Sequence, residues 1–305
     1  MKVLLIGYGS IGKRHFDILS DFDEVDSINV VTKQNIDNVK TFKSLKDIED
    51  INVYDYFIIA NETSKHYEQL DYVCKYTTNK NILVEKPLFD KEYTLESCDN
   101  NVFVAYNLRF HPLLQKLKEI LKDEDVYYAN VLAGQYLPTW RPDQDYRESY
   151  SAKLSQGGGV LRDLSHELDY INWIFGDMTV ISSINTKISD LEIESDDIFT
   201  ALAKTSAGTI INVTMDYISK MPLRKIMIHT KTKTIEANIV TNTINIFNRD
   251  GIENSIVLDK LHRDYTYTNM HKAIINNDFQ NVCNLKEGLQ TVDIIEKNGL
   301  KEMHV

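Results

Sequence analysis

The chain has 305 residues, of which 43% are hydrophobic and 26% are charged, and its formal net charge is −11. This length suggests about two domains, and the composition is that of a folded globular protein, which excludes disordered and fibrous proteins. Because carboxylates are in surplus, we expect neither nucleic acid nor an anionic membrane as a partner.

The N-terminal residues and the cysteines indicate a cytoplasmic protein. The apolar run 3–6 is ended by Gly7, which is too short for a signal peptide, and no stretch reaches the roughly 18 apolar residues of a membrane span. The three cysteines, Cys74, Cys98 and Cys283, are odd in number and lack a CxxC pair. We therefore expect reduced thiols and neither a disulfide nor a metal site.

Over the first third of the chain, short apolar runs alternate with helix-like patterns. The expected strands are residues 2–6, 27–31, 56–60, 81–84 and 102–106, and the expected helices are residues 11–19 and 64–76. This alternation is typical of an α/β fold with a parallel sheet covered on both faces.

The pattern changes after a helix expected at 112–121. From Val126 onward strands dominate, and they are followed by two closing helices at about 267–277 and 285–297. The later strands, which we expect to form an antiparallel meander, are residues 179–188, 199–205, 209–217, 225–230, 234–240 and 243–248. We expect residues 109–305 to form a second α/β domain on a mostly antiparallel open sheet.

A glycine motif follows the first strand. It reads Gly7-Tyr8-Gly9-Ser10-Ile11-Gly12 and lies between a strand and a helix, where a Rossmann domain binds the dinucleotide pyrophosphate. We therefore predict a Rossmann dinucleotide-binding domain over residues 1–108, with Ser10 and Ile11 among the cofactor contacts. A merely tight strand-to-helix turn is the alternative.

The end of the second strand bears on the choice between NAD and NADP. A carboxylate usually binds the ribose of NAD about 20 residues after the last glycine, whereas this chain has Thr32 and Lys33 there. With Arg14 as a second cation, this favours the 2′-phosphate of NADP, unless Lys33 is simply solvated. Asn61 and Glu85, at the ends of the third and fourth strands, complete the predicted cofactor contacts together with Lys86.

Two groups of residues suggest proton transfer. Glu85-Lys86-Pro87 follows the fourth strand, so Lys86 is placed to hydrogen-bond a substrate oxygen, although a surface lysine is the ordinary alternative. Asp163 and His166 follow a glycine triplet at an i, i+3 spacing, which places them on one helix face. A carboxylate beside an imidazole suits a general acid/base, although a structural histidine remains the alternative.

Aromatic and arginine side chains gather between residues 135 and 147. Sugars stack on aromatic rings, and arginine binds phosphate or carboxylate groups. Trp140, Arg141, Tyr146 and Arg147 are therefore candidate substrate contacts. Tyrosine and tryptophan also suit a subunit interface.

The order of these motifs resembles the Gfo/Idh/MocA family, the glucose-fructose oxidoreductase and inositol dehydrogenase group. The resemblance implies NAD(P)-dependent hydride transfer on a sugar or sugar derivative without a metal, such as an amino, keto or activated sugar of glycan-precursor metabolism. It also implies a homodimer or homotetramer formed through the C-terminal sheet.

By the same resemblance, Lys86 matches the catalytic lysine and His166 the histidine acid/base. Many members have the aspartate four residues before the histidine, where this chain has Arg162, so Asp163 departs from the pattern and orients the histidine, orients the substrate or does neither. Arg109 matches a segment leaving the Rossmann domain, where it either contacts substrate or forms an interdomain salt bridge. A non-catalytic sensor or partner subunit and a Rossmann methyltransferase are the rivals, and neither requires Lys86.

Overall fold

The computed structural model describes residues 1–300, except for the side chain of Ile252. The chain divides into two compact units. Within the described residues, the first unit comprises residues 1–110 together with 262–292, and the second comprises residues 111–261 together with 293–300. The expected second domain ran without interruption from residue 109, whereas in the structure residues 262–292 pack with the first unit.

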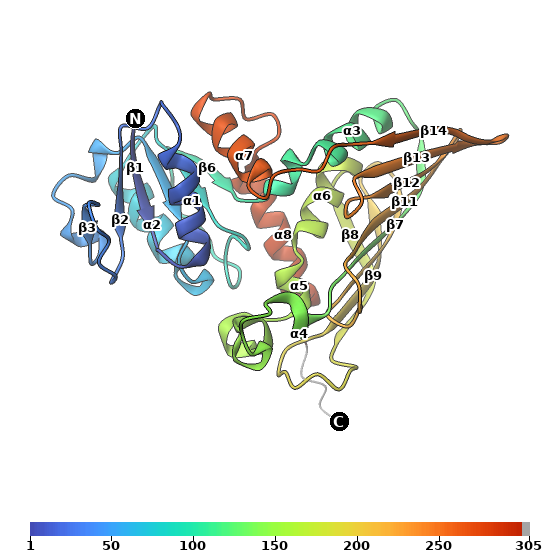
Figure 1. Cartoon of the computed structure of the whole chain (residues 1–305), viewed down its shortest axis with the longest axis horizontal. Helices are drawn as coiled ribbons and strands as arrows, with labels where there is room; N and C mark the ends of the chain where they lie inside the picture. The colour runs from blue at the N-terminus through green and yellow to red at the C-terminus, as the bar shows by residue number, and fades with distance from the viewer. Residues whose placement is uncertain (301–305) are drawn as a thin grey trace. The chain divides into compact units, whose positions relative to one another are not determined.

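A seven-stranded sheet forms the first unit, in the order β15-β6-β5-β4-β1-β2-β3 (Figure 1). The strands are β1 Lys2–Ile6, β2 Ser27–Val31, β3 Thr41–Phe42, β4 Tyr56–Ile59, β5 Asn81–Val84, β6 Asn101–Val104 and β15 Cys283–Asn284. All neighbours are parallel except β15, which pairs antiparallel with β6. Apolar side chains such as Leu4 and Leu5 are buried on opposite faces of the sheet, which confirms the expected doubly covered α/β sheet.

Helices cover both faces of this sheet. They are α1 Ser10–Ser20, α2 His66–Tyr76, α7 Tyr265–Ile275 and the first half of α8 Leu285–Asn298. Short 3₁₀ helices lie at Leu45–Asp47, Ile51–Val53, Thr63–Lys65 and Asn107–Phe110. The two-residue strand β15 brings residues 262–292 back to the first unit, and such a short strand carries no periodic signal in the sequence.

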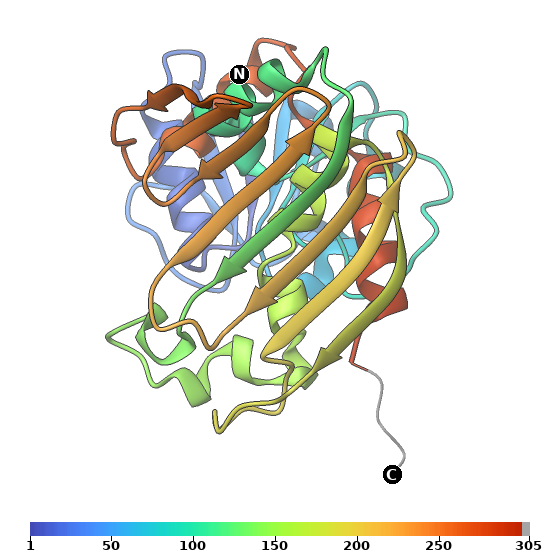
Figure 2. The same ribbon diagram turned by 90° about the vertical axis from the view of Figure 1, so that its right-hand side faces the viewer.

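The second unit is built on an eight-stranded sheet in the order β14-β13-β12-β11-β7-β10-β9-β8, seen from its open face in Figure 2. The strands are β7 Val126–Gly134, β8 Met178–Thr186, β9 Ile198–Thr205, β10 Ile210–Asp216, β11 Leu223–Thr230, β12 Thr234–Asn238, β13 Thr243–Asn248 and β14 Gly251–Val257. The strand β7 lies between β10 and β11 and pairs parallel with β10. The expected simple meander is therefore wrong, although the sheet is mostly antiparallel.

The helices of the second unit are short around the glycine triplet. They are α3 Pro112–Leu121, α4 Leu137–Trp140, α5 Val160–Asp163 and α6 His166–Phe175, with 3₁₀ helices at Tyr146–Glu148, Tyr150–Ala152 and Leu154–Gln156. The turn at residues 164–165 separates α5 from α6. Asp163 and His166 therefore lie on two helices rather than on one continuous helix.

One cysteine prediction is wrong. Cys74, in the last turn of α2, forms a disulfide with Cys98, in the segment before β6, while Cys283 is a buried thiol. The two cysteines are 24 residues apart, and this spacing matches no cysteine motif. The pair could not be predicted because the fold, rather than the local sequence, brings the two positions together. The expectation of a cytoplasmic protein loses the support of its reduced thiols.

A membrane span is not found in the part of the chain that the structure describes, since none of its helices is both long and apolar enough.

Candidate functional site

The carboxyl ends of β1, β4 and β5 meet at one edge of the first unit. Gly7 leaves β1 with a φ of +101°, and a Cβ there would lie 2.6 Å from the backbone nitrogen of Asn61, which follows β4. The imidazole of His66 then joins Asn61 to the next strand end: its Nε2 lies 3.2 Å from the Asn61 carbonyl, and its Nδ1 lies 3.1 Å from that of Leu88. In an open parallel sheet this edge is where ligands bind.

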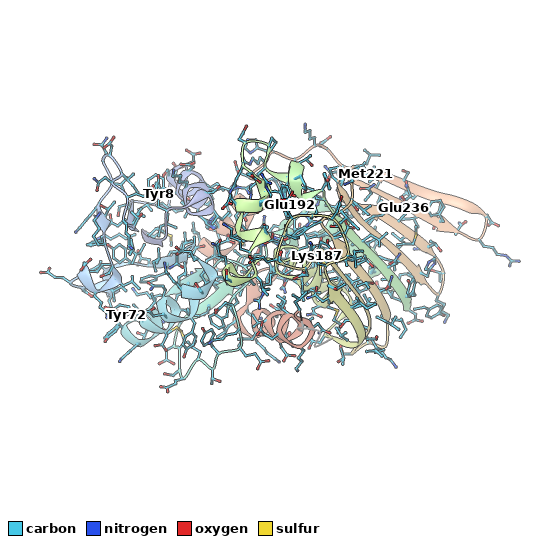
Figure 3. The ribbon with its side chains drawn as sticks, turned by 90° about the horizontal axis from the view of Figure 1, so that it is seen from below. Tyr8, Tyr72, Lys187, Glu192, Met221 and Glu236 are labelled. Atoms are coloured by element: carbon cyan, nitrogen blue, oxygen red, sulfur yellow. A yellow bond between two sulfur atoms is a disulfide. The ribbon has the colours of Figure 1, made fainter. Side chains whose placement is uncertain are left out.

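The glycine loop leaves the first turn of α1 open. Gly9 is the N-cap residue, and within the described chain no side chain caps the helix. A Cβ on Gly9 would have nothing within 4 Å, whereas one on Gly12 would lie 2.3 Å from the Gly7 carbonyl oxygen. Gly12 is thus required by packing, while Gly9 leaves space in front of uncapped N–H groups that suit a phosphate. Tyr8 of this loop, labelled in Figure 3, packs edge-to-face on Phe16.

Asn61 also fits a bound dinucleotide. Its Oδ1 atom is buried and has no hydrogen-bond partner among the described residues. A buried acceptor without a donor is costly, so its retention at a ligand edge indicates a donor from a ligand. This is consistent with the predicted role of Asn61 in cofactor binding.

Lys86 lies in the loop after β5, between Glu85 and Pro87. The Lys86-Pro87 peptide bond is cis, as the proline allowed. Glu85 is buried, with its Oε1 2.9 Å from His15 Nε2 and its Oε2 accepting from the Lys86 backbone N–H at 3.1 Å. Glu85 was expected to contact the cofactor, but its carboxylate is engaged inside the unit.

The side chains expected to bind the 2′-phosphate of NADP, at the end of β2 and on α1, are not all accessible to a ligand. Lys33 is exposed, and its carbonyl accepts a hydrogen bond from the ammonium of Lys43 at 3.1 Å, so two cations lie at this strand end. Thr32 Oγ1 accepts from the backbone N–H of Gln34. Arg14 instead pairs with Asp264 at 2.7 Å, and its guanidinium lies over a tyrosine ring, which argues against the expected role for it.

In the second unit, Asp163 is the centre of a buried polar cluster. Its Oδ2 accepts hydrogen bonds of 2.6 Å from Ser151 Oγ and from the Tyr217 hydroxyl. Burial and the negative charge of Asp163 raise the pKa of Tyr217 well above its ordinary value, so Tyr217 remains a donor. His166, the first residue of α6, is half-buried. The hydroxyl partners of Asp163 had no signal in the sequence.

Two glycines of the triplet at residues 157–159 pack closely against their neighbours. A Cβ on Gly158 would lie 2.2 Å from the Tyr150 carbonyl oxygen, and one on Gly159 would lie 2.1 Å from Asp196 Oδ1. The Asp196 carboxylate in turn accepts from the Leu161 N–H at 3.0 Å. Burial raises the pKa of Asp196 to about 6.

This raised pKa gives the unfolding free energy a defined pH dependence. Because the folded pKa of Asp196 lies above its ordinary value of 3.8, its contribution to stability is full below about pH 4 and is lost as the pH rises through about 6. Two pKa units correspond to about 3 kcal/mol. We expect Asp196→Asn to remove this component, so that the wild type loses more stability than D196N between pH 4 and 7 in urea unfolding. An equal pH dependence of the two proteins would contradict the assignment.

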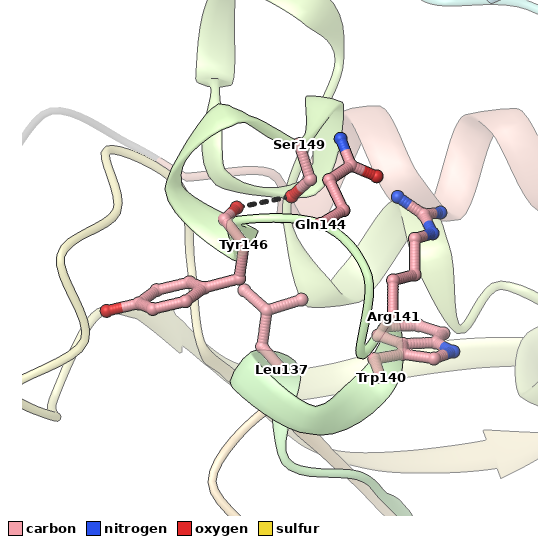
Figure 4. Close-up of a pocket in the computed structure, with 6 residues that line it drawn as sticks. All are labelled: Leu137, Trp140, Arg141, Gln144, Tyr146 and Ser149. Carbon is pink, nitrogen blue, oxygen red and sulfur yellow. Dashed lines mark hydrogen bonds between the residues drawn. The ribbon is translucent and has the colours of Figure 1, made fainter.

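The aromatic and arginine segment lines a small pocket in the second unit (Figure 4). Its walls are Leu137, Trp140, Arg141, Gln144, Tyr146 and Ser149. Trp140 packs edge-to-face on Tyr217, whose hydroxyl binds Asp163, so the structure joins this predicted contact to the Asp163 cluster. The Tyr146 ring points away from the Arg141 guanidinium, and the Tyr146 hydroxyl accepts from a backbone N–H at 3.2 Å.

Two predicted substrate contacts are already paired inside their units. Arg147 is bound at the surface by Asp145 at 2.7 Å and by Glu192 at 3.2 Å. Arg109 is 2% exposed and pairs with Glu287 of α8 at 3.1 Å. Arg109 therefore forms an ion pair, but the pair lies within the first unit and is not the interdomain salt bridge given as the alternative.

Comparison with known proteins identifies the same two parts. Residues 1–107 match the sequence model of the oxidoreductase family with an NAD-binding Rossmann fold, and residues 114–236 match the GFO/IDH/MocA C-terminal domain. A curated relative, YteT of Bacillus subtilis, which is named as an oxidoreductase, is 25% identical over 131 residues. That match covers 40% of this chain and 30% of the relative.

Solved structures share the fold along nearly the whole chain. UDP-N-acetylglucosamine 3-dehydrogenase from Acidithiobacillus ferrooxidans is 16% identical, with a TM-score of 0.75 over 98% of this chain and 96% of that one. Levoglucosan dehydrogenase, in complex with NADH and levoglucosan, is 17% identical, with a TM-score of 0.76 over 98% of this chain and 96% of that one. The family models of both domains match this sequence, and the glycine loop lies at the ligand-binding edge of the sheet. The chain therefore belongs to the Gfo/Idh/MocA family of oxidoreductases, as its motifs indicated.

Proposed function

We propose that this protein transfers a hydride between NAD(P) and a carbinol or carbonyl carbon of a sugar or sugar derivative. The observation that carries the proposal is the shared edge of β1, β4 and β5. There the uncapped turn at Gly9, the unpartnered Oδ1 of Asn61 and the loop bearing Lys86 follow neighbouring strands. The bound nicotinamide supplies the hydride donor or acceptor.

The chain's own residues manage the proton and the substrate. The Lys86 ammonium hydrogen-bonds the reacting oxygen, and His166 exchanges the proton on it. Asp163, which accepts hydrogen bonds from Ser151 and Tyr217, orients His166 or the substrate. Trp140 and Arg141 offer a ring face and a guanidinium to the sugar.

For the cofactor, we propose a preference for NADP(H). This preference is supported by the exposed Lys33 beside Lys43, and by a β2 end, Val30-Val31-Thr32-Lys33, without a carboxylate. The NADH in the levoglucosan dehydrogenase structure supports NAD(H) as the competing cofactor. Comparing initial rates with both cofactors distinguishes them.

We further propose that the eight-stranded sheet joins copies of the chain. Apolar side chains at 43–61% exposure lie on its neighbouring strands β8 and β9, at Ile181, Ile184 and Leu202. An exposed apolar patch on a sheet is typical of an interface. Light scattering on the purified protein should give a dimer or tetramer, and a monomer at micromolar concentration would contradict this proposal.

The catalytic proposal is tested by following absorbance at 340 nm. The protein is mixed with each of the four nicotinamide dinucleotides and a panel of hexoses, an anhydrosugar and UDP-N-acetylhexosamines. We expect turnover with at least one sugar. If no sugar changes the absorbance although the dinucleotide binds, the chain is a non-catalytic dinucleotide-binding subunit instead.

A further inference from the structure

Four buried side chains of the first unit form a continuous hydrogen-bond chain that ends beside Lys86. Glu85 Oε1 lies 2.9 Å from His15 Nε2, and His15 Nδ1 lies 2.8 Å from His271 Nε2. His271 Nδ1 lies 2.9 Å from the Tyr56 hydroxyl. The two histidines and Tyr56 are 0% exposed, and Glu85 is 5% exposed.

Each member of this chain comes from a different part of the first unit. Glu85 follows β5, His15 lies on α1 behind the glycine loop, Tyr56 begins β4, and His271 lies on the returning helix α7. The second oxygen of Glu85 accepts from the Lys86 backbone N–H. This series of hydrogen bonds therefore connects the backbone of Lys86 to the helix that follows the glycine loop.

Assigning donors and acceptors gives the hydrogen bonds between these four side chains a single direction. The Glu85 carboxylate only accepts, so His15 Nε2 carries the proton between them. If His15 is neutral, its Nδ1 accepts from His271 Nε2–H, and His271 Nδ1 accepts from the Tyr56 hydroxyl. If His15 were doubly protonated, His271 would donate to Tyr56 instead, and the buried Tyr56 hydrogen would have no acceptor among the described residues. Only the first arrangement satisfies every buried polar atom.

The surroundings of the four hydrogen-bonded side chains agree with this arrangement of protons. Burial raises the pKa of Tyr56 well above its ordinary value, which keeps the hydroxyl a donor. Burial lowers the pKa of His271 well below its ordinary value, which keeps that ring neutral. The other rings packed on the two histidines are Tyr267 and Phe22, and neither carries a charge near pH 7.

We propose that His15, His271 and Tyr56 are positioning residues for Lys86. They hold Glu85 in one orientation, and Glu85 fixes the Lys86 backbone relative to α1. The contacts of His66 with the Pro87 and Leu88 carbonyls also hold this loop. The catalytic consequence rests on the proposed function of Lys86, whereas the proton arrangement does not.

The first test reads the proton arrangement directly and needs no substrate. Nitrogen-15 NMR of the full chain, labelled at histidine, distinguishes the two neutral tautomers from imidazolium. His15→Gln and His271→Gln assign the two signals. We expect both rings at pH 7 to carry hydrogen on Nε2 and none on Nδ1. A proton on Nδ1 of either ring would overturn the directional chain.

The second test separates positioning from mere stability. Tyr56→Phe removes the terminal donor, while Tyr54→Phe removes a hydroxyl of similar burial that is bonded to Asn29 at 2.7 Å, outside the chain. The rates are measured with the sugar that the 340 nm absorbance assay identifies as a substrate. We expect kcat of Y56F to fall about threefold to tenfold below that of Y54F, with KM and the NADH Kd unchanged. Equal kcat values for the two variants would overturn the positioning role.

A third readout remains if no sugar is turned over. Glu85→Gln keeps the shape of the side chain but places an NH₂ against either the His15 or the Lys86 N–H donor. Acetic anhydride labelling of the full chain, quantified for Lys86 by mass spectrometry, should then proceed at a rate at least threefold different from the wild type. The control Glu68→Gln, on the exposed face of α2, should not change the rate. An unchanged rate in E85Q would refute the positioning of Lys86 independently of the catalytic proposal.

Discussion

Lys86→Met is expected to lower kcat/KM for the sugar by about 10² to 10⁴-fold while leaving dinucleotide affinity within about threefold. Methionine keeps the length and the apolar stem of the lysine, but it supplies neither a proton nor a positive charge. The backbone contacts of the loop, through Glu85 and His66, do not depend on the Lys86 ammonium. The loss should therefore fall on catalysis rather than on folding.

The measurement for this variant is a steady-state rate at 340 nm combined with an NADH fluorescence titration. Lys46→Met, at an exposed lysine of the same unit, is the matched control and should behave as the wild type. If K86M retained turnover within a few-fold of the K46M rate while still binding NADH, the proton-transfer role of Lys86 would be wrong.

Gly9→Ala should weaken dinucleotide binding at least tenfold without unfolding the protein. Gly9 has an ordinary negative φ and nothing within 4 Å of a Cβ, so the protein itself tolerates alanine. The added methyl group instead occupies the space in front of the uncapped turn, where a pyrophosphate would approach the backbone. A tenfold loss corresponds to about 1.4 kcal/mol, roughly one charge-assisted hydrogen bond.

Gly12→Ala provides the contrast. Its Cβ would lie 2.3 Å from the Gly7 carbonyl oxygen, so this variant should lose folding stability as well as binding. Calorimetric titration with NADH and thermal unfolding of both variants distinguish the two effects. Wild-type affinity in G9A would show that the dinucleotide does not approach the glycine loop as proposed.

Much of the first unit could be predicted because its strands are short apolar runs and its glycine loop has a fixed spacing. The structure confirms β1, β2, β4 and β5 within a residue of the expected bounds. The spacing from Gly7 to Gly12 sets a local geometry, and both glycines are indeed in close contact with backbone atoms. Such features depend on neighbours in sequence, which a single sequence displays.

Long-range pairings could not be predicted. The strand β15, the disulfide of Cys74 with Cys98 and the Arg109–Glu287 ion pair each join positions between 24 and about 180 residues apart. The same holds for His15, whose place on the buried face of α1 follows from helical periodicity but whose partner His271 comes from the far end of the chain. A charged or polar residue alone does not reveal whether it faces a ligand or a partner in the fold, which is why Arg14 and Glu85 were expected to bind cofactor.

The most direct test of hydride transfer uses a sugar labelled with deuterium at the carbon that is oxidised. After turnover with NAD⁺ or NADP⁺, mass spectrometry of the reduced nicotinamide should find one deuterium for each sugar oxidised, since the hydride passes directly between the two carbons. Oxidised sugar with no deuterium in the nicotinamide would contradict the proposed reaction.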